Sequence, residues 1–110
     1  MKLSDLSALF GFEAVFPAEG TTAIVDAYTS DLLSDVMAKA AEGSVLITIQ
    51  AHKNTIAVAS LIGIRAIVIC NERAVPDDMV AAAKDEAIAI YRTTKTQFEV
   101  SGLLYRELRG

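Results

Sequence analysis

The chain has 110 residues, the size of one domain, and can bury a core without a metal or disulfide to hold it. Hydrophobic residues make up 53% of the sequence and aromatic residues 6%, which suits helices packed closely on a sheet. The net charge of -4, without any basic stripe, argues against nucleic acid and anionic membranes as partners.

Neither a secretion signal nor a membrane span is recognisable. The N-terminal segment carries Asp5 and Glu13 and lacks the apolar core of a signal peptide. No apolar run approaches the ~18–20 residues of a membrane span. A single cysteine, Cys70, excludes an internal disulfide, and core packing is its expected role. We expect one cytoplasmic domain over residues 1–110.

The first predicted elements are short. Ser4 is a candidate N-cap and Gly11 a candidate end for a first helix. Apolar patterns predict strands over 12–16 and 23–28, joined by a turn-rich loop over 17–22.

A longer helix is predicted from Ser30 as N-cap to Gly43. Its expected inner face consists of Leu32, Leu33, Val36, Met37 and Ala40. Apolar, β-branched runs over 44–49 and 65–70 predict central strands covered on both faces, as in parallel sheets.

The remaining helices show clear capping signals. Asn54 is the candidate N-cap of a helix that ends at Gly63, and Pro76 suits the first position of the next helix. The expected inner face of that next helix is Val80, Ala83 and Ala87. After a strand over 88–92, Thr96 and Glu99 have the spacing of a capping box. The last helix has the apolar stripe Val100, Leu103, Leu104 and Leu108.

Strands and helices therefore alternate with short connections. Compact crossovers give parallel strands in right-handed βαβ units. The predicted fold class is α/β, a three-layer open, mostly parallel sheet with helices on both faces.

Ligands of open α/β sheets bind beyond the carboxyl ends of the strands. Polar stretches follow four of the predicted strands, and each precedes a helix whose N-terminus attracts anions. The predicted ligand-binding residues are Tyr28, Ser30, Asp31, Gln50, His52, Lys53, Asn54, Asn71, Thr93, Thr94 and Thr96. Helix capping and turn formation are the alternative explanation for the same polar residues.

His52, the only histidine, directly follows a predicted central strand together with Lys53. These two residues either contact an anionic ligand or form an exposed turn, and the sequence leaves both interpretations open. Histidine is a preferred residue neither for caps nor for turns.

Catalytic and metal-binding motifs are absent from the sequence. It contains no nucleophile elbow, no G-x-x-x-x-G-K-S/T phosphate loop and no G-x-G-x-x-G dinucleotide motif. One histidine and one cysteine on different strand ends do not form a metal-ligand cluster. We therefore expect no catalytic residues, no metal and no cofactor.

Three segments carry a resemblance to a known family. SDLLSDVM (30–37), ITIQAHKN (47–54) and TQFEVSGLLY (96–105) are similar to stand-alone DRTGG-domain proteins, and the resemblance extends over essentially the whole chain. The family is named for a D-R-T stretch after one strand and a glycine pair after the next. Here these places hold His52-Lys53-Asn54 and Cys70-Asn71-Glu72.

The resemblance implies a fold similar to the N-terminal domain of HPr kinase and a regulatory role. Such domains are fused to phosphotransacetylases and to some pyrophosphatases, where they help bind adenine nucleotides at a dimer interface. Our leading hypothesis is a non-catalytic, homodimeric regulatory module that binds an adenine-nucleotide-like anion at the strand ends. The alternative is a protein-interaction scaffold for a partner enzyme without a small-molecule ligand. An enzyme is a third, less favoured hypothesis.

Overall fold

The computed structural model describes residues 1–17 and 22–110, so the predicted loop over 17–22 lies mostly outside the described residues. The elements are α1 (Asp5–Ala8), β1 (Glu13–Phe16), β2 (Asp26–Thr29), α2 (Leu33–Lys39), β3 (Ser44–Thr48), α3 (Lys53–Ile62), β4 (Ala66–Ile69), α4 (Asp77–Glu86), β5 (Ala89–Arg92) and α5 (Gln97–Arg109). Among the helices in these two ranges, none is long and apolar enough to cross a membrane.

The five strands form one sheet in the order β1-β5-β4-β3-β2. Strands β2 to β5 are mutually parallel, and β1 pairs antiparallel with β5 at one edge. This arrangement confirms the prediction of an open, mostly parallel sheet. The parallel strands are joined by the crossover helices α2, α3 and α4, as short βαβ connections require.

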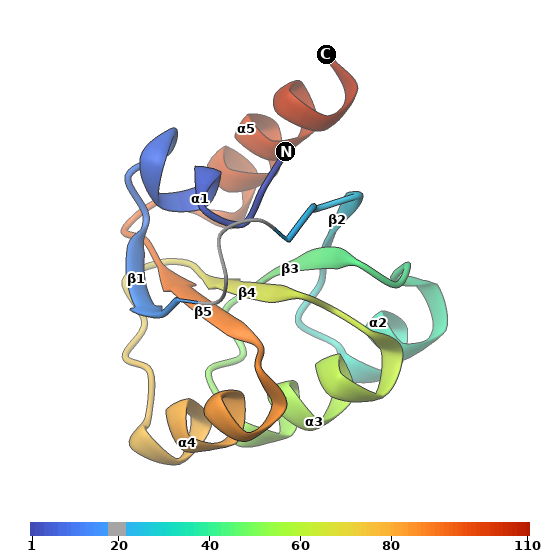
Figure 1. Ribbon diagram of the computed structural model, residues 1–110, viewed down its shortest axis with the longest axis vertical. Helices are drawn as coiled ribbons and strands as arrows, with labels where there is room; N and C mark the ends of the chain where they lie inside the picture. Colours follow the sequence, from blue (N-terminus) through green and yellow to red (C-terminus); the bar gives the residue numbers. More distant parts are fainter. Residues whose placement is uncertain (18–21) are drawn as a thin grey trace.

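Helices cover both faces of the sheet. Figure 1 shows α1 and α5 on one side and α2, α3 and α4 on the other. Successive residues of β3 point to opposite faces, so Val45 and Ile47 pack with α1 and α5, whereas Leu46 packs with α2 to α4. Burial on both faces is the reason why the central strands are continuously apolar. The predicted three-layer fold is therefore confirmed.

The start of α2 differs from the prediction. Ser30 is not the N-cap, because its Oγ accepts a hydrogen bond from the Leu32 N–H (3.2 Å) within the preceding loop. The helix begins at Leu33, with Leu32 in the N-cap position and no side-chain cap. Only Val36 of the expected inner face is fully buried, while Leu32 and Met37 are 64% and 45% exposed.

The starts of α3 and α4 are also shifted. His52, not Asn54, occupies the N-cap position of α3, because the Thr55 hydroxyl donates to the Gln50 carbonyl (2.8 Å) and closes the turn early. Pro76 stands one residue before α4.

The inner face of α4 is centred on Met79 and Ala83. Ala87 is exposed and ends the helix at φ 55°, so its prediction as a core residue is wrong. The Thr96–Glu99 capping box at the start of α5 is confirmed.

Candidate functional site

Four strand-to-helix connections leave the same edge of the sheet. The register pairs Thr48 of β3 with Ile69 of β4 and Ile69 with Arg92 of β5, so neighbouring strands end side by side. All predicted ligand-binding residues lie at the ends of strands or in the connections and helix starts that follow them. This carboxyl edge is the candidate site.

Asp31 holds three of these connections together. Its Oδ1 accepts hydrogen bonds from the Thr48 hydroxyl (2.8 Å), the Ile49 N–H (2.9 Å) and the Gln97 amide (3.0 Å). These donors come from the end of β3 and the start of α5, whereas Asp31 itself precedes α2. A carboxylate that accepts several hydrogen bonds in one place fixes the relative position of the segments that donate them.

The turn between β3 and α3 is held by its backbone and presents its side chains to solvent. The Gln50 N–H donates to the Thr48 hydroxyl (3.1 Å), and the Gln50 carbonyl accepts from Thr55. His52 has extended backbone and makes no side-chain cap hydrogen bond, and His52, Lys53 and Asn54 are exposed. The first turn of α3 therefore lacks a side-chain acceptor from its N-cap residue and carries the cation of Lys53 beside it.

The turn after β4 has an unusual backbone. Asn71 and Glu72 have φ values of 60° and 55°, and the Arg73 N–H bonds back to the Cys70 carbonyl (3.3 Å). Two consecutive positive φ values inside a four-residue turn match a type I′ turn, which favours glycine, asparagine and aspartate. The backbone that suits a glycine pair is thus present at Asn71-Glu72 without glycines.

Hydrogen bonds lock this turn against the next connection. The Asn71 and Glu72 N–H groups donate to the carbonyls of Lys95 (2.9 Å) and Thr93 (2.8 Å). The Arg92 guanidinium donates to the carbonyls of Glu72 (2.7 Å) and Arg73 (2.8 Å). The backbone donors of the turn are therefore used within the protein and do not face a ligand.

The connection before α5 caps the N-terminus of that helix. The Thr96 hydroxyl accepts from the Glu99 N–H (3.2 Å), and the Glu99 carboxylate accepts from the Thr96 N–H (3.1 Å), which holds the pKa of Glu99 below its usual value. The Thr93 hydroxyl accepts from the Lys95 N–H (3.1 Å). A cavity of about 170 Å³ lies beside this connection and is lined by Gly11, Glu13, Glu72, Arg92, Thr93 and Thr94.

The hydroxyl groups of Tyr28 and Ser30 form hydrogen bonds within the protein. The Tyr28 hydroxyl donates to Asp35 of α2 (2.8 Å), a contact that raises the pKa of Tyr28. Ser30 is bonded within its own loop, as described for the start of α2. Among the predicted residues, the exposed side chains are those of the β3–α3 turn, Asn71, Thr94 and Thr96.

Three residues that organise the edge are not among the predicted ligand-binding residues. Thr48 carried a signal, because it is a polar residue within a buried apolar strand. Arg92 ended a predicted strand, and only the fold places it against the β4 turn. Gln97 meets Asp31 across a separation of 66 positions, for which a single sequence has no local signal.

Cys70 is packed in the core and is not reactive in this fold. Burial, with a smaller contribution from the Asp31 carboxylate, raises the pKa of its thiol to about 12. Because the thiolate is the nucleophile and metal ligand, the neutral thiol is inert. Within residues 1–17 and 22–110, no three His, Cys, Asp or Glu side chains gather in a way that could hold a metal ion.

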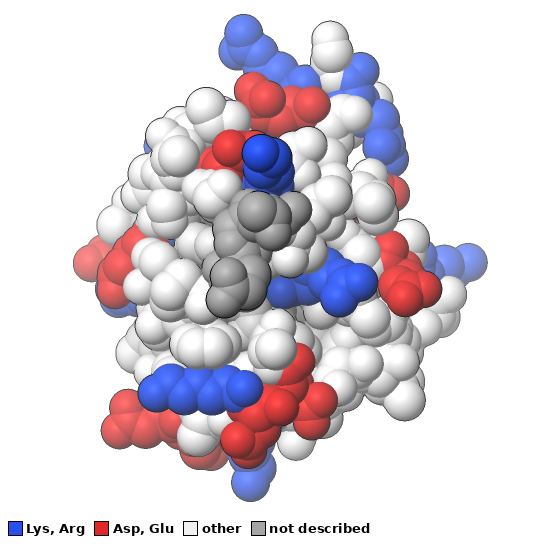
Figure 2. Space-filling model, in the orientation of Figure 1, with Lys and Arg blue, Asp and Glu red and all other residues white. Residues whose placement is uncertain are grey.

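Charge is mixed across the face that Figure 2 shows. Acidic and basic side chains alternate there, and basic groups gather at the upper end, where α5 ends with Arg106 and Arg109.

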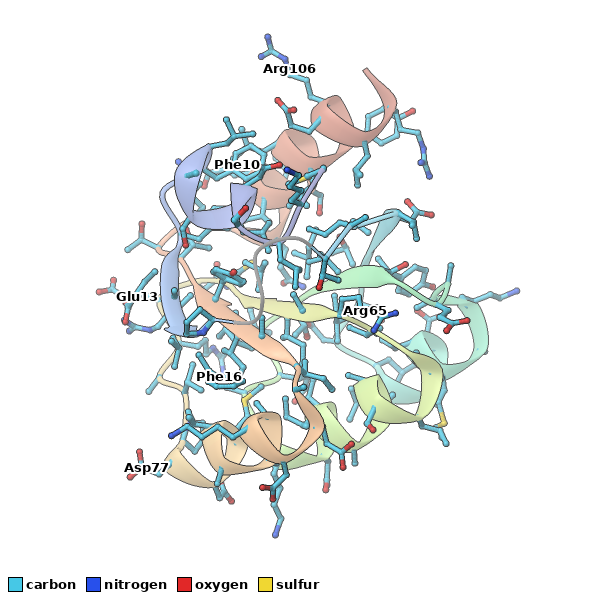
Figure 3. All side chains as sticks on the ribbon, in the orientation of Figure 1. Phe10, Glu13, Phe16, Arg65, Asp77 and Arg106 are labelled. Atoms are coloured by element: carbon cyan, nitrogen blue, oxygen red, sulfur yellow. The ribbon has the colours of Figure 1, made fainter. Side chains whose placement is uncertain are left out.

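Figure 3 shows Glu13 pointing outward from β1 and Asp77 at the start of α4. Negative charge therefore stands at the first turn of α4.

Comparison with known proteins supports the fold. No family model matches the sequence, and no curated protein matches it. Among solved structures, the fold is similar to that of the CBS and DRTGG domains of the regulatory region of Clostridium perfringens pyrophosphatase, complexed with its activator diadenosine tetraphosphate. The TM-score is 0.70 at 16% identity, over 93% of this chain and 45% of that chain. The chain thus spans less than half of that structure, and the likeness supports the DRTGG resemblance at the level of the fold.

Proposed function

We propose that the chain is a non-catalytic regulatory module that forms a homodimer and binds an adenine-nucleotide-like anion at the carboxyl edge of its sheet. The observation that carries this proposal is the fold shared with a regulatory region that was solved with diadenosine tetraphosphate. That region belongs to a pyrophosphatase, so the partner expected for this chain is also an enzyme.

The start of α3 is the place where an anion fits best. Its N-cap residue supplies no side-chain acceptor, and the exposed Lys53 adds a positive charge to the positive end of the helix dipole. The start of α5 is closed by its capping box, and the start of α4 carries two aspartates, Asp77 and Asp78. Phosphate groups are therefore expected at His52 and Lys53.

The turn at Asn71-Glu72 serves a different purpose in this proposal. Its backbone N–H groups are already bonded to the β5–α5 connection, and Glu72 brings a carboxylate that repels phosphate. We expect this side of the edge to face the uncharged part of a ligand, with the amides of Gln50 and Asn71 as hydrogen-bonding groups.

Isothermal titration calorimetry with AMP, ADP, ATP and diadenosine tetraphosphate tests the proposal. Lys53→Ala should weaken binding about tenfold, since a charge-assisted contact of about 1.4 kcal/mol is lost. Lys84→Ala is the matched control, because Lys84 lies in the last turn of α4, at the other end of that helix from the carboxyl edge. If none of the four nucleotides binds at millimolar concentration, the proposed binding of an adenine-nucleotide-like anion is refuted.

A further inference from the structure

The outer face of α5 exposes two large aromatic side chains. Phe98 and Tyr105 are 88% and 67% exposed, although the chain has only seven Phe and Tyr residues (four and three). Intervals of four and three place Phe98, Gly102 and Tyr105 along one stripe of the helix, which we call the α5 outer face. The opposite face, with Val100 and Leu104, is buried in the core.

Gly102 has no role in the packing of its own domain. A Cβ added there would meet no atom of residues 1–17 and 22–110 within 4 Å, and the residue does not have the positive φ that would require glycine. A glycine inside a helix costs about 1 kcal/mol relative to alanine. The absence of a side chain does, however, let the backbone of another helix approach closely.

A shallow hollow runs beside this glycine. It has a volume of about 420 Å³ and is lined by Lys95, Phe98, Glu99, Gly102, Leu103 and Arg106. Gly102 and Leu103 form its centre, while Glu99 lies toward the start of the helix and Arg106 toward the end. Figure 3 shows Arg106 projecting away from the body of the protein at the upper end of α5.

We infer that the α5 outer face is the contact between two copies of this chain, with the two α5 helices antiparallel across a two-fold axis at Gly102. This inference rests on the homodimer of the proposed function and gives it a surface. Residues equally distant from Gly102 then face one another, so Phe98 meets the second copy's Arg106 and Glu99 meets the second copy's Tyr105.

Charge selects the antiparallel arrangement. It brings Glu99 of each copy toward Arg106 of the other, and it lets the Arg106 guanidinium lie on the Phe98 ring of the second copy, although Lys95 and Arg109 also approach one another. A parallel pair would set Glu99 against Glu99 and Arg106 against Arg106. The second copy's Phe98 enters the hollow beside Gly102 and Leu103, which removes the most exposed aromatic ring from water.

Disulfide trapping tests this geometry directly. In Gly102→Cys the two introduced thiols meet at the axis, so mild oxidation should convert most of the protein to a covalent dimer on a non-reducing gel. The native Cys70 does not compete, because it is fully buried. Leu61→Cys is the control, since Leu61 is 73% exposed on α3, and it should remain largely uncrosslinked. Equal crosslinking of both variants would overturn the inference.

Analytical ultracentrifugation of single-site variants distinguishes the proposed α5 contact surface from the homodimer itself. Phe98→Glu should raise the dissociation constant of the dimer at least tenfold, whereas Leu61→Glu should leave it unchanged. A dimer that persists in Phe98→Glu, with no crosslink in Gly102→Cys, would overturn the α5 surface and leave the homodimer standing. A wild-type chain that stays monomeric at all concentrations would overturn both, and nucleotide titration would still report separately on the ligand.

Discussion

Replacing Glu72 with glycine should make the protein more stable. Glu72 has φ 55°, and the left-handed region costs an L-residue about 1–2 kcal/mol. Its side chain is exposed and makes no hydrogen bond to the described part of the chain, so little is lost with it. Glycine adds about 0.5–1 kcal/mol of unfolded-state entropy. The expected net gain is about 0.5–1 kcal/mol.

Urea denaturation of Glu72→Gly, monitored by far-UV circular dichroism, measures this gain in unfolding free energy. In a separate thermal denaturation, the melting temperature of the variant should be about 2–4 °C higher than that of the wild type. Glu72→Gln is the matched control, because it removes the charge but keeps the Cβ. Ala87→Gly should gain similarly, since Ala87 also has φ 55°, whereas Asn71→Gly should gain less because asparagine tolerates this region. A Glu72→Gly protein no more stable than Glu72→Gln would refute the reasoning.

Further predictions concern the edge, the core and pH. Asp31→Ala should lower the free energy of unfolding by about 2–3 kcal/mol, because two side-chain donors and one backbone donor lose a charged acceptor; a smaller loss than in Asp31→Asn would contradict this. Ser44→Ala should stabilise the protein by about 1 kcal/mol in urea denaturation, since the buried Ser44 hydroxyl has no hydrogen-bond partner among the described residues, and a loss of stability would count against that account. Iodoacetamide at pH 9 should label Cys70 only after unfolding, because its raised pKa and burial suppress the thiolate; rapid labelling of folded protein is the contrary result. Because the pKa of Glu99 is lowered in the folded protein, its contacts with Thr96 stabilise the fold at a pH above the unfolded-state pKa of Glu99, and this contribution is lost as the pH falls through the folded-state pKa. The difference in unfolding free energy between wild type and Thr96→Ala should therefore shrink in acid, and a difference that stays constant with pH would contradict this prediction.

The arrangement of the sheet could be predicted because its central strands carry an unambiguous pattern. The runs over 44–49 and 65–70 are apolar at successive positions, and only strands covered on both faces need this. The start of α2 could not be predicted, because Ser30 and Asp31 suit a helix cap equally well. Hydrogen bonds within the loop and to β3 decide instead that the helix begins after them.

The position of the candidate site could be predicted from the sequence, but the hydrogen bonds within it could not. Parallel strands place their following loops at one edge, which is why His52, Lys53 and Asn71 lie on the same side of the sheet. The bond between Asp31 and Gln97 depends on how α5 docks, and no local pattern encodes that. The left-handed backbone at Glu72 was hidden because glutamate is a poor residue for that conformation.

The pairing of β1 with β5 has a consequence for how the chain is made. The register joins Glu13 to Arg92, so the strand of this sheet that is synthesised earliest takes the strand that is synthesised latest as its neighbour. Until residue 92 has been synthesised, β1 has no strand to pair with, while β2 to β4 can already assemble. Contacts between such distant positions form slowly. During synthesis β1 therefore stays unpaired within this sheet, and the sheet is completed only when β5 is inserted between β4 and β1.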